Sequence, residues 1–143
     1  MNEMLWKKFI TKSKDETKGL AQNFAKKLSG GDIVLLSGDL GAGKTVFAKG
    51  LAKGLGIDED ITSPTFTIMN CYQNKLNHFD LYRLNSVDEL LGVGAEEELY
   101  SDKISLVEWP EIVGFDFFPN SAIVVQIVKV DENTREINFK LND

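Results

Sequence analysis

One stretch of this 143-residue chain contains residues whose types and spacing suit phosphate chemistry. The G-x-x-x-x-G-K-[ST] pattern runs from Gly38 to Thr45 without a substitution. Its glycines let the backbone turn tightly and bring N–H groups close to phosphate oxygens, with no side chain in the way. In such a loop the lysine, here Lys44, reaches the β- and γ-phosphates, and the hydroxyl of Thr45 ligates Mg²⁺. The pattern therefore predicts a site for nucleotide phosphates.

The segments beside the loop favour this interpretation over a chance glycine-rich turn. The apolar run Ile33–Leu36 is typical of a buried parallel strand. Apolar residues recur at helical spacing after the loop, and Gly54 and Gly56 mark the end of that helix. The positive end of the helix dipole then lies at the phosphate site. The loop residues predicted to bind the nucleotide are Gly38, Asp39, Leu40, Gly41, Ala42, Gly43, Lys44, Thr45 and Val46.

Two acidic residues in predicted strands are candidates for handling a metal ion or water. Partial alternation over Leu76–Leu84 places His78 and Asp80 on one face of a strand. An acid in a strand needs a partner, so we expect Asp80 to orient water or support the metal, and His78 to be a hydrogen-bonded structural residue. Glu108 ends the apolar strand that starts at Ile104, where phosphate-loop enzymes place a metal-organising acid. We expect a direct or water-bridged Mg²⁺ contact from Glu108, with an exposed surface glutamate as the alternative.

Two further features have open interpretations. Ser63–Thr67 contains three hydroxyl residues soon after the phosphate loop. It is either a loop that senses the γ-phosphate or its Mg²⁺, as switch loops do, or a plain turn into the next strand. Trp109 directly follows Glu108, and it either belongs to the core or covers the nucleotide.

The N-terminal part of the chain predicts a strand followed by a helix. Trp6–Thr11 has the composition of a short strand. The S-x-x-E pattern at Ser13–Glu16 is a capping box, and it opens a helix whose apolar face extends to Leu28. Within it, we expect Ser13 and Thr17 to serve as a cap and as a surface polar residue.

The order of the predicted elements indicates an α/β fold of the P-loop NTPase type. We expect a mostly parallel central sheet flanked by helices. Ala122–Val130 and Arg135–Leu141 are joined by a short polar segment and predict a C-terminal antiparallel hairpin. The length of the chain corresponds to a single domain over residues 1–143.

Composition narrows the functional classes. The formal net charge is −6, and arginine occurs at two positions, Arg83 and Arg135. Because a protein that grips nucleic acid by itself usually shows a basic stripe, stable direct binding of DNA or tRNA is disfavoured. Cys71 is the single cysteine, with no disulfide or metal-ligand companion, which fits a reducing cytosol. The chain has no apolar run of about 18 residues and no secretory signal in Met1–Phe9, so we expect a cytoplasmic protein without a membrane span.

The nucleotide is expected to be ATP. GTPases recognise guanine with N-K-x-D, and the nearest string here, Asn74-Lys75-Leu76-Asn77, lacks the final Asp. A small-molecule kinase is the main alternative to an ATPase, but kinases usually carry an acceptor pocket and a lid with arginines. A slow ATPase that receives its catalytic cation from a partner fits the residues better. A non-catalytic nucleotide sensor is a third option.

Four segments together resemble the TsaE family of bacterial ATPases, formerly the YjeE and YdiB type. Their order and spacing match the family over essentially the whole chain. Many families share the phosphate loop, whereas the second and third segments are much more specific. The four segments are Gly38–Thr45, Ser63-Pro64-Thr65-Phe66, His78-Phe79-Asp80-Leu81-Tyr82-Arg83 and Val107-Glu108-Trp109-Pro110.

This resemblance implies a role in tRNA modification. TsaE-type proteins support threonylcarbamoylation of adenosine 37 in tRNAs that read codons beginning with A. They act on a complex of the TsaD and TsaB type, and binding and hydrolysis of ATP drive its association or reset. The resemblance thus implies ATP and Mg²⁺ as cofactors, and contact with tRNA only through the complex.

The resemblance also implies roles for individual residues. Thr45 and Glu108 would hold Mg²⁺, and Asp80 would lie near the attacking water and the metal, although Asp80 and Glu108 could exchange roles. Thr65 would lie in a switch-like loop and act with Lys44 in catalysis. The N-terminal segment of the family approaches the adenine, which makes Thr11, Ser13 and Thr17 candidates for that side of the site.

Overall fold

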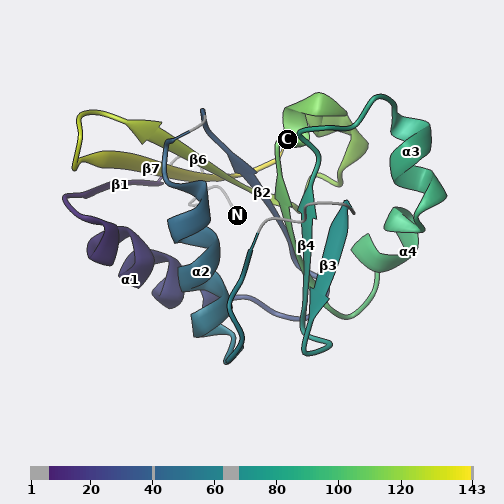
Figure 1. The fold of residues 1–143 in the computed structure, drawn as a ribbon, viewed down its shortest axis with the longest axis horizontal. Helices are drawn as coiled ribbons and strands as arrows, with labels where there is room; N and C mark the ends of the chain where they lie inside the picture. Colours follow the sequence, from purple (N-terminus) through teal and green to yellow (C-terminus); the bar gives the residue numbers. More distant parts are fainter. Residues whose placement is uncertain (1–6, 40, 63–67, 143) are drawn as a thin grey trace.

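The computed structural model describes residues 7–39, 41–62 and 68–142, and its centre is a seven-stranded sheet with strand order β1-β7-β6-β2-β5-β4-β3 (Figure 1). Thr65 and Leu40, two of the predicted site residues, lie outside the described residues. The strands are β1 (Lys7–Thr11), β2 (Ile33–Ser37), β3 (Met69–Tyr72), β4 (Leu76–Asp80), β5 (Ile104–Glu108), β6 (Ile123–Lys129) and β7 (Arg135–Leu141). The helices are α1 (Lys14–Ala25), α2 (Lys44–Gly54), α3 (Val87–Gly92) and α4 (Ala95–Leu99), with 3₁₀ turns η2 (Pro110–Ile112) and η3 (Phe115–Phe117).

The sheet is mixed, so the expectation of a mostly parallel sheet is wrong, while the α/β class is confirmed. Strands β6, β2, β5 and β4 are parallel to one another at the centre. Antiparallel pairs extend the sheet at both ends, β1 with β7 and β7 with β6 on one side and β3 with β4 on the other. Short connections cause the β3–β4 and β6–β7 pairs, because a tight turn can join only antiparallel strands, whereas β1 pairs with β7 from the other end of the chain. The C-terminal hairpin is present as β6 and β7.

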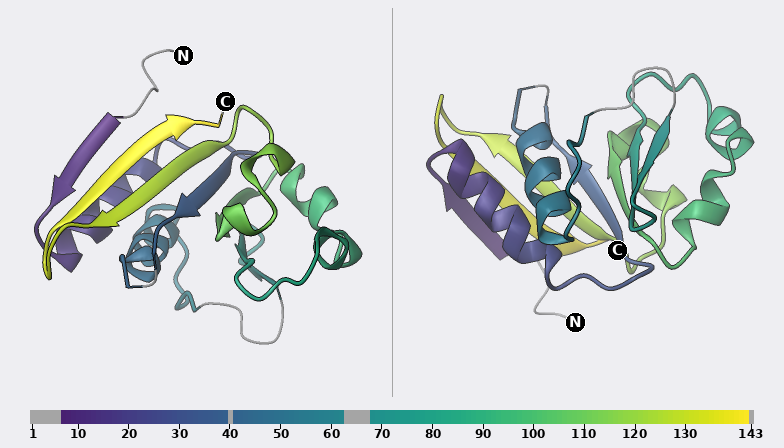
Figure 2. Two further views of the ribbon diagram at one scale, coloured as in Figure 1. Left: turned by 90° about the horizontal axis from the view of Figure 1, so that it is seen from above. Right: turned by 60° about the horizontal axis from the view of Figure 1, so that its bottom comes forward.

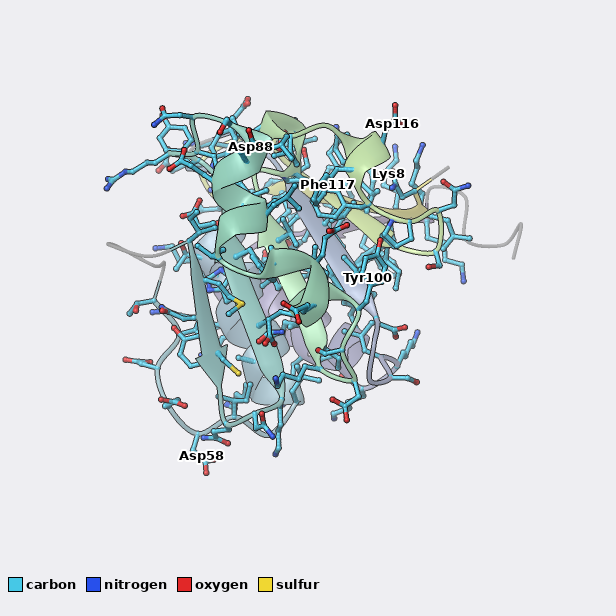
Figure 3. The ribbon with its side chains drawn as sticks, turned by 90° about the vertical axis from the view of Figure 1, so that its right-hand side faces the viewer. Lys8, Asp58, Asp88, Tyr100, Asp116 and Phe117 are labelled. Carbon is cyan, nitrogen blue, oxygen red and sulfur yellow. The ribbon has the colours of Figure 1, made fainter. Side chains whose placement is uncertain are left out.

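Helices cover both faces of the central strands (Figures 1 and 2). In β2, Val34 and Leu36 face the core formed with α1 and α2, whereas Ile33 and Leu35 face the core on the side of α3 and α4. Burial on both faces explains why β2 is continuously apolar. Figure 3 looks onto α3 and α4, where Asp88 and Tyr100 mark the outer surface.

Helices α1 and α2 lie side by side in close contact (Figure 2). A side chain at Gly50 would collide with the carbonyl oxygen of Lys18, and one at Gly54 would collide with that of Gln22. Glycine at these two positions therefore lets the backbones approach, which fixes the N-terminus of α1 beside the loop that begins α2.

Two predicted elements are shorter than expected. Helix α1 ends at Ala25, not at Leu28, because the chain turns through Lys26 and Leu28 donates to Ala25 O. Strand β4 ends at Asp80, whose side-chain Oδ1 accepts a hydrogen bond from Tyr82 N and turns the chain. Among the described residues, no helix is long and apolar enough to cross a membrane.

Candidate functional site

A cleft of about 360 Å³ lies where the central parallel strands end. Strands β2, β4 and β5 run in the same direction, so the residues at their carboxyl ends meet at one edge of the sheet. The cleft brings together most of the residues predicted from the sequence. Those that line it are Ser13, Thr17, Gly41, Gly43, Lys44, Thr45, Val46, Asp80, Glu108 and Trp109.

The loop between β2 and α2 presents backbone, not side chains, to this cleft. Gly41 and Gly43 have φ values of 80° and 109°, a region that favours glycine. Gly43 is the N-cap of α2, and Gly43 O accepts the hydrogen bond of Phe47 N. The first N–H groups of this 11-residue helix are therefore directed to the loop. Gly38, Asp39 and Ala42 lie on the other side of the loop and do not line the cleft.

Lys44 is buried at the start of α2. Its Nζ donates a hydrogen bond to Gly38 O at 2.6 Å and lies 3.4 Å from the ring centroid of Trp109. Burial lowers the pKa of Lys44, while the acidic residues around it, Glu108 foremost, act in the opposite direction. The ammonium group is thus held inside the loop by a carbonyl and an aromatic face.

Asp80 and Glu108 are neighbours across the last register pair of β4 and β5. Burial raises the pKa of Asp80, and the charge of Glu108 adds to the shift. The hydrogen bond from Tyr82 N and the charges of His78 and Lys44 oppose it. Two carboxyl groups placed together in a partly desolvated cleft favour a cation between them or a shared proton.

Glu108 is 4% exposed, so the alternative of a surface glutamate is wrong. Its Oε2 lies 2.6 Å from Nε2 of His78, which is also buried. His78 is therefore a buried, hydrogen-bonded structural residue, as we expected. It orients the Glu108 carboxylate, which faces the cleft.

The donor set at this edge fits Mg²⁺. The hydroxyl of Thr45 and the carboxylates of Asp80 and Glu108 are hard oxygen ligands that border one cleft. The described residues contain no group of three or more His, Cys, Asp or Glu side chains arranged to hold a metal alone. Mg²⁺ does not require such a cage, since it usually binds through one or two carboxylates together with phosphate oxygens and water.

The side of the cleft formed by α1 corrects one expectation. Ser13 is the N-cap of α1 and accepts a hydrogen bond from Glu16 N, as predicted. Thr17 is buried, contrary to our expectation of a surface residue, and its hydroxyl lies 2.6 Å from that of Thr11. Thr11 is the last residue of β1 and is itself buried, so the two hydroxyls pair with each other away from solvent.

Trp109 lies between the core and the cleft, and its role as a cover for the nucleotide stays a prediction. Its ring borders the cleft and lies tilted against the ring of Tyr82, with a centroid distance of 4.8 Å, and it also packs against the core on the α3 side. The backbone of Trp109 is left-handed, with φ of 60°, directly before Pro110. This conformation is uncommon for a bulky residue and is characteristic of functional sites.

Five residues of the cleft were absent from our predictions: Lys14, Tyr82, Glu132, Asn133 and Arg135. Arg135 donates from Nε to Ala42 O at 2.8 Å. The spacing of the sequence contains no signal for this contact, since 93 residues separate its partners. Tyr82 could have been found from the alternation that starts at Leu76, which continues through Asp80 to Tyr82.

Comparison with known proteins decides the family. The family model described as "Threonylcarbamoyl adenosine biosynthesis protein TsaE" matches residues 11–137. The chain belongs to the TsaE family. The matched range contains the phosphate loop, both carboxylates and the first residues of β7. This TsaE-family protein is therefore involved in threonylcarbamoyladenosine (t6A) biosynthesis.

Individual TsaE proteins are similar over nearly the full chain. A tRNA threonylcarbamoyladenosine biosynthesis protein TsaE from Treponema pallidum is 38% identical over 130 residues, covering 90% of this chain and 96% of the relative. The Bacillus subtilis TsaE is 37% identical over 142 residues, covering 97% and 86%. The crystal structure of Bacillus subtilis YdiB superposes with a TM-score of 0.76 at 34% identity, covering 96% of this chain and 86% of YdiB.

Proposed function

We propose that this TsaE-family protein is a slow, Mg²⁺-dependent ATPase with a P-loop NTPase fold. The observation that carries the proposal is the meeting of Lys44, Asp80 and Glu108 in one cleft beside the N-terminus of α2. A cation from the loop faces two acids from adjacent parallel strands, which is the arrangement that phosphoryl transfer to water requires.

Each residue has a defined task in this proposal. The backbone N–H groups of the loop and the Lys44 ammonium bind the phosphates, and Lys44 exchanges Gly38 O and the Trp109 ring for phosphate oxygens. Mg²⁺ bound with ATP would neutralise phosphate charge, held by Thr45 and Glu108. Asp80, with a raised pKa, orients the attacking water.

The proposed partner is a TsaD/TsaB-type complex that carries out the threonylcarbamoylation of adenosine 37. Two observations support a partner. The cations among the described residues of the cleft are Lys14, Lys44 and Arg135. Because the side chain of Arg135 is already bonded to backbone carbonyls, we infer that a partner supplies the catalytic cation. The net charge of −6 favours binding of a protein over direct capture of tRNA. ATP turnover would then accompany association or reset of the complex.

The test is ATP hydrolysis by the purified chain, alone and with a TsaD/TsaB-type complex, with tRNA added as a separate variable. We expect slow hydrolysis alone and clear stimulation by the complex, both lost in Lys44→Ala. Formation of ADP that depends on an added small acceptor, together with a phosphorylated product, would instead indicate a kinase. Binding of ATP without turnover under all conditions would indicate a nucleotide sensor.

A further inference from the structure

Arg135, the first residue of β7, joins two loops that are far apart in the sequence. Its Nε donates to Ala42 O at 2.8 Å, and its Nη2 lies 3.5 Å from Gly41 O, both in the phosphate loop. Its Nη1 donates to Asp131 O at 2.8 Å and to Thr134 O at 3.1 Å, both in the β6–β7 turn. Within the described residues, every recorded hydrogen bond of this guanidinium ends on a backbone carbonyl.

The β6–β7 turn that Arg135 contacts is held in place by its own hydrogen bonds. Asp131 Oδ1 accepts hydrogen bonds from Asn133 N and Thr134 N, and Val130 N donates to Thr134 O. Arg135 is then paired on both sides in the sheet, with Thr11 of β1 and Lys129 of β6. The sheet therefore fixes the backbone of Arg135, from which its side chain reaches the loop.

The contact with Ala42 O has a direct consequence for the phosphate loop. In a planar trans peptide the C=O and N–H bonds point in opposite directions. Holding the carbonyl of Ala42 on the Arg135 side therefore directs the N–H of Gly43 to the other side. Gly43 adopts φ of 109° and, lacking a Cβ, has few steric limits on its backbone rotation; an added Cβ would be 3.6 Å from Arg135 Nε.

We propose that Arg135 is a positioning residue that holds the phosphate loop in the conformation that receives nucleotide. It acts through backbone carbonyls and ties the loop to the β6–β7 turn. Arginine suits this task because one planar group donates in several fixed directions, whereas a lysine ammonium is a point charge on a flexible stem. The effect on ATP binding rests on the proposed function, while the effect on the loop does not.

The first test needs no nucleotide. Amide hydrogen exchange of peptides covering residues 38–47 is compared in the wild type, Arg135→Ala, Arg135→Lys and Arg83→Ala, with circular dichroism to verify folding. Arg83 is the matched control, since it is an exposed arginine that does not line the cleft. We expect exchange about fivefold faster or more in Arg135→Ala, a smaller increase in Arg135→Lys and none in Arg83→Ala. Unchanged loop exchange in folded Arg135→Ala overturns the proposal.

The second test is ATP affinity by calorimetry on the same four proteins. We expect Arg135→Ala to bind about tenfold more weakly or worse, and Arg135→Lys to remain about threefold weaker than the wild type. Wild-type affinity and loop exchange in Arg135→Lys would mean that charge alone suffices, and would overturn the positioning role. If the wild type does not bind ATP, the proposed function fails, and the exchange data still decide whether Arg135 holds the loop.

Discussion

Nε2 of His78 lies 2.6 Å from Oε2 of Glu108, and both side chains are buried beneath the cleft. An ionised carboxylate accepts this hydrogen bond from a protonated Nε2 of His78. Nδ1 of His78 is buried without a hydrogen-bond partner among the described residues. The contact connects β4 to β5 and orients the carboxylate at the cleft.

Two substitutions of Glu108 separate its structural contact from its charge. We expect Glu108→Ala to lower the free energy of unfolding by about 1–3 kcal/mol, because it leaves His78 without its partner. Glu108→Gln keeps an oxygen beside His78 and should retain most of the stability. Both variants should lose the gain in ATP affinity that Mg²⁺ provides. Urea unfolding and calorimetry with and without Mg²⁺ measure these effects, and equal Mg²⁺ dependence in the wild type and Glu108→Gln would remove Glu108 from the metal site.

Lys44→Ala should weaken phosphate binding while the fold survives. Burying the Lys44 ammonium group costs desolvation free energy, and the variant no longer has this cost. The gain offsets the loss of the contacts with Gly38 O and the Trp109 ring, so we expect little change in stability. We expect ATP affinity to fall about tenfold or more, with a melting temperature within about 3 °C of the wild type. Normal ATP affinity by calorimetry would contradict the assignment of the phosphate loop.

Asp80→Asn should stabilise the protein at neutral pH. Burial raises the pKa of Asp80 in the folded state above its value in the unfolded state. Between these two pKa values the folded state therefore binds more protons than the unfolded state. The free energy of unfolding therefore falls as pH rises through that window and stays lower above it. Asparagine removes this cost and keeps an oxygen for the hydrogen bond from Tyr82 N.

Thermal unfolding at several pH values checks this prediction. We expect Asp80→Asn to melt above the wild type at pH 7 and to lose this advantage below pH 3.8, the ordinary pKa of aspartate. ATP hydrolysis should be lost in the same variant. An advantage that persists unchanged at low pH would show that the charge of Asp80 is not its source.

ATP should change the fluorescence of Trp109. In the structure the Lys44 ammonium lies over the indole ring, and phosphate binding should draw it away. The chain contains two tryptophans, so Trp6→Phe leaves Trp109 as the sole reporter. We expect an ATP-dependent change in Trp6→Phe and none in Trp6→Phe/Lys44→Ala. A constant spectrum at an ATP concentration shown by calorimetry to saturate the site would mean that Lys44 stays on the ring.

Local chemistry is the part of this protein that its sequence determined. The G-x-x-x-x-G-K-[ST] spacing is sufficient to predict the loop, because the proposed phosphate site consists of consecutive backbone N–H groups and the next helix N-terminus. The acids were predictable for a related reason. Glu108 was predicted at the end of its strand, and Asp80 as an acid inside a longer strand; in the structure both end parallel strands, whose carboxyl ends meet at one edge.

Tertiary structure alone decided the contacts between distant segments. The antiparallel edge formed by β1, β7 and β6 places Arg135 at the start of β7, from where its Nε donates to Ala42 O in the loop. This contact joins residues 93 positions apart and depends on strand order, register and the direction of one side chain. Periodicity and motif spacing describe only neighbours along the chain, so they contain no information on a hydrogen bond whose partners meet only when the sheet is complete.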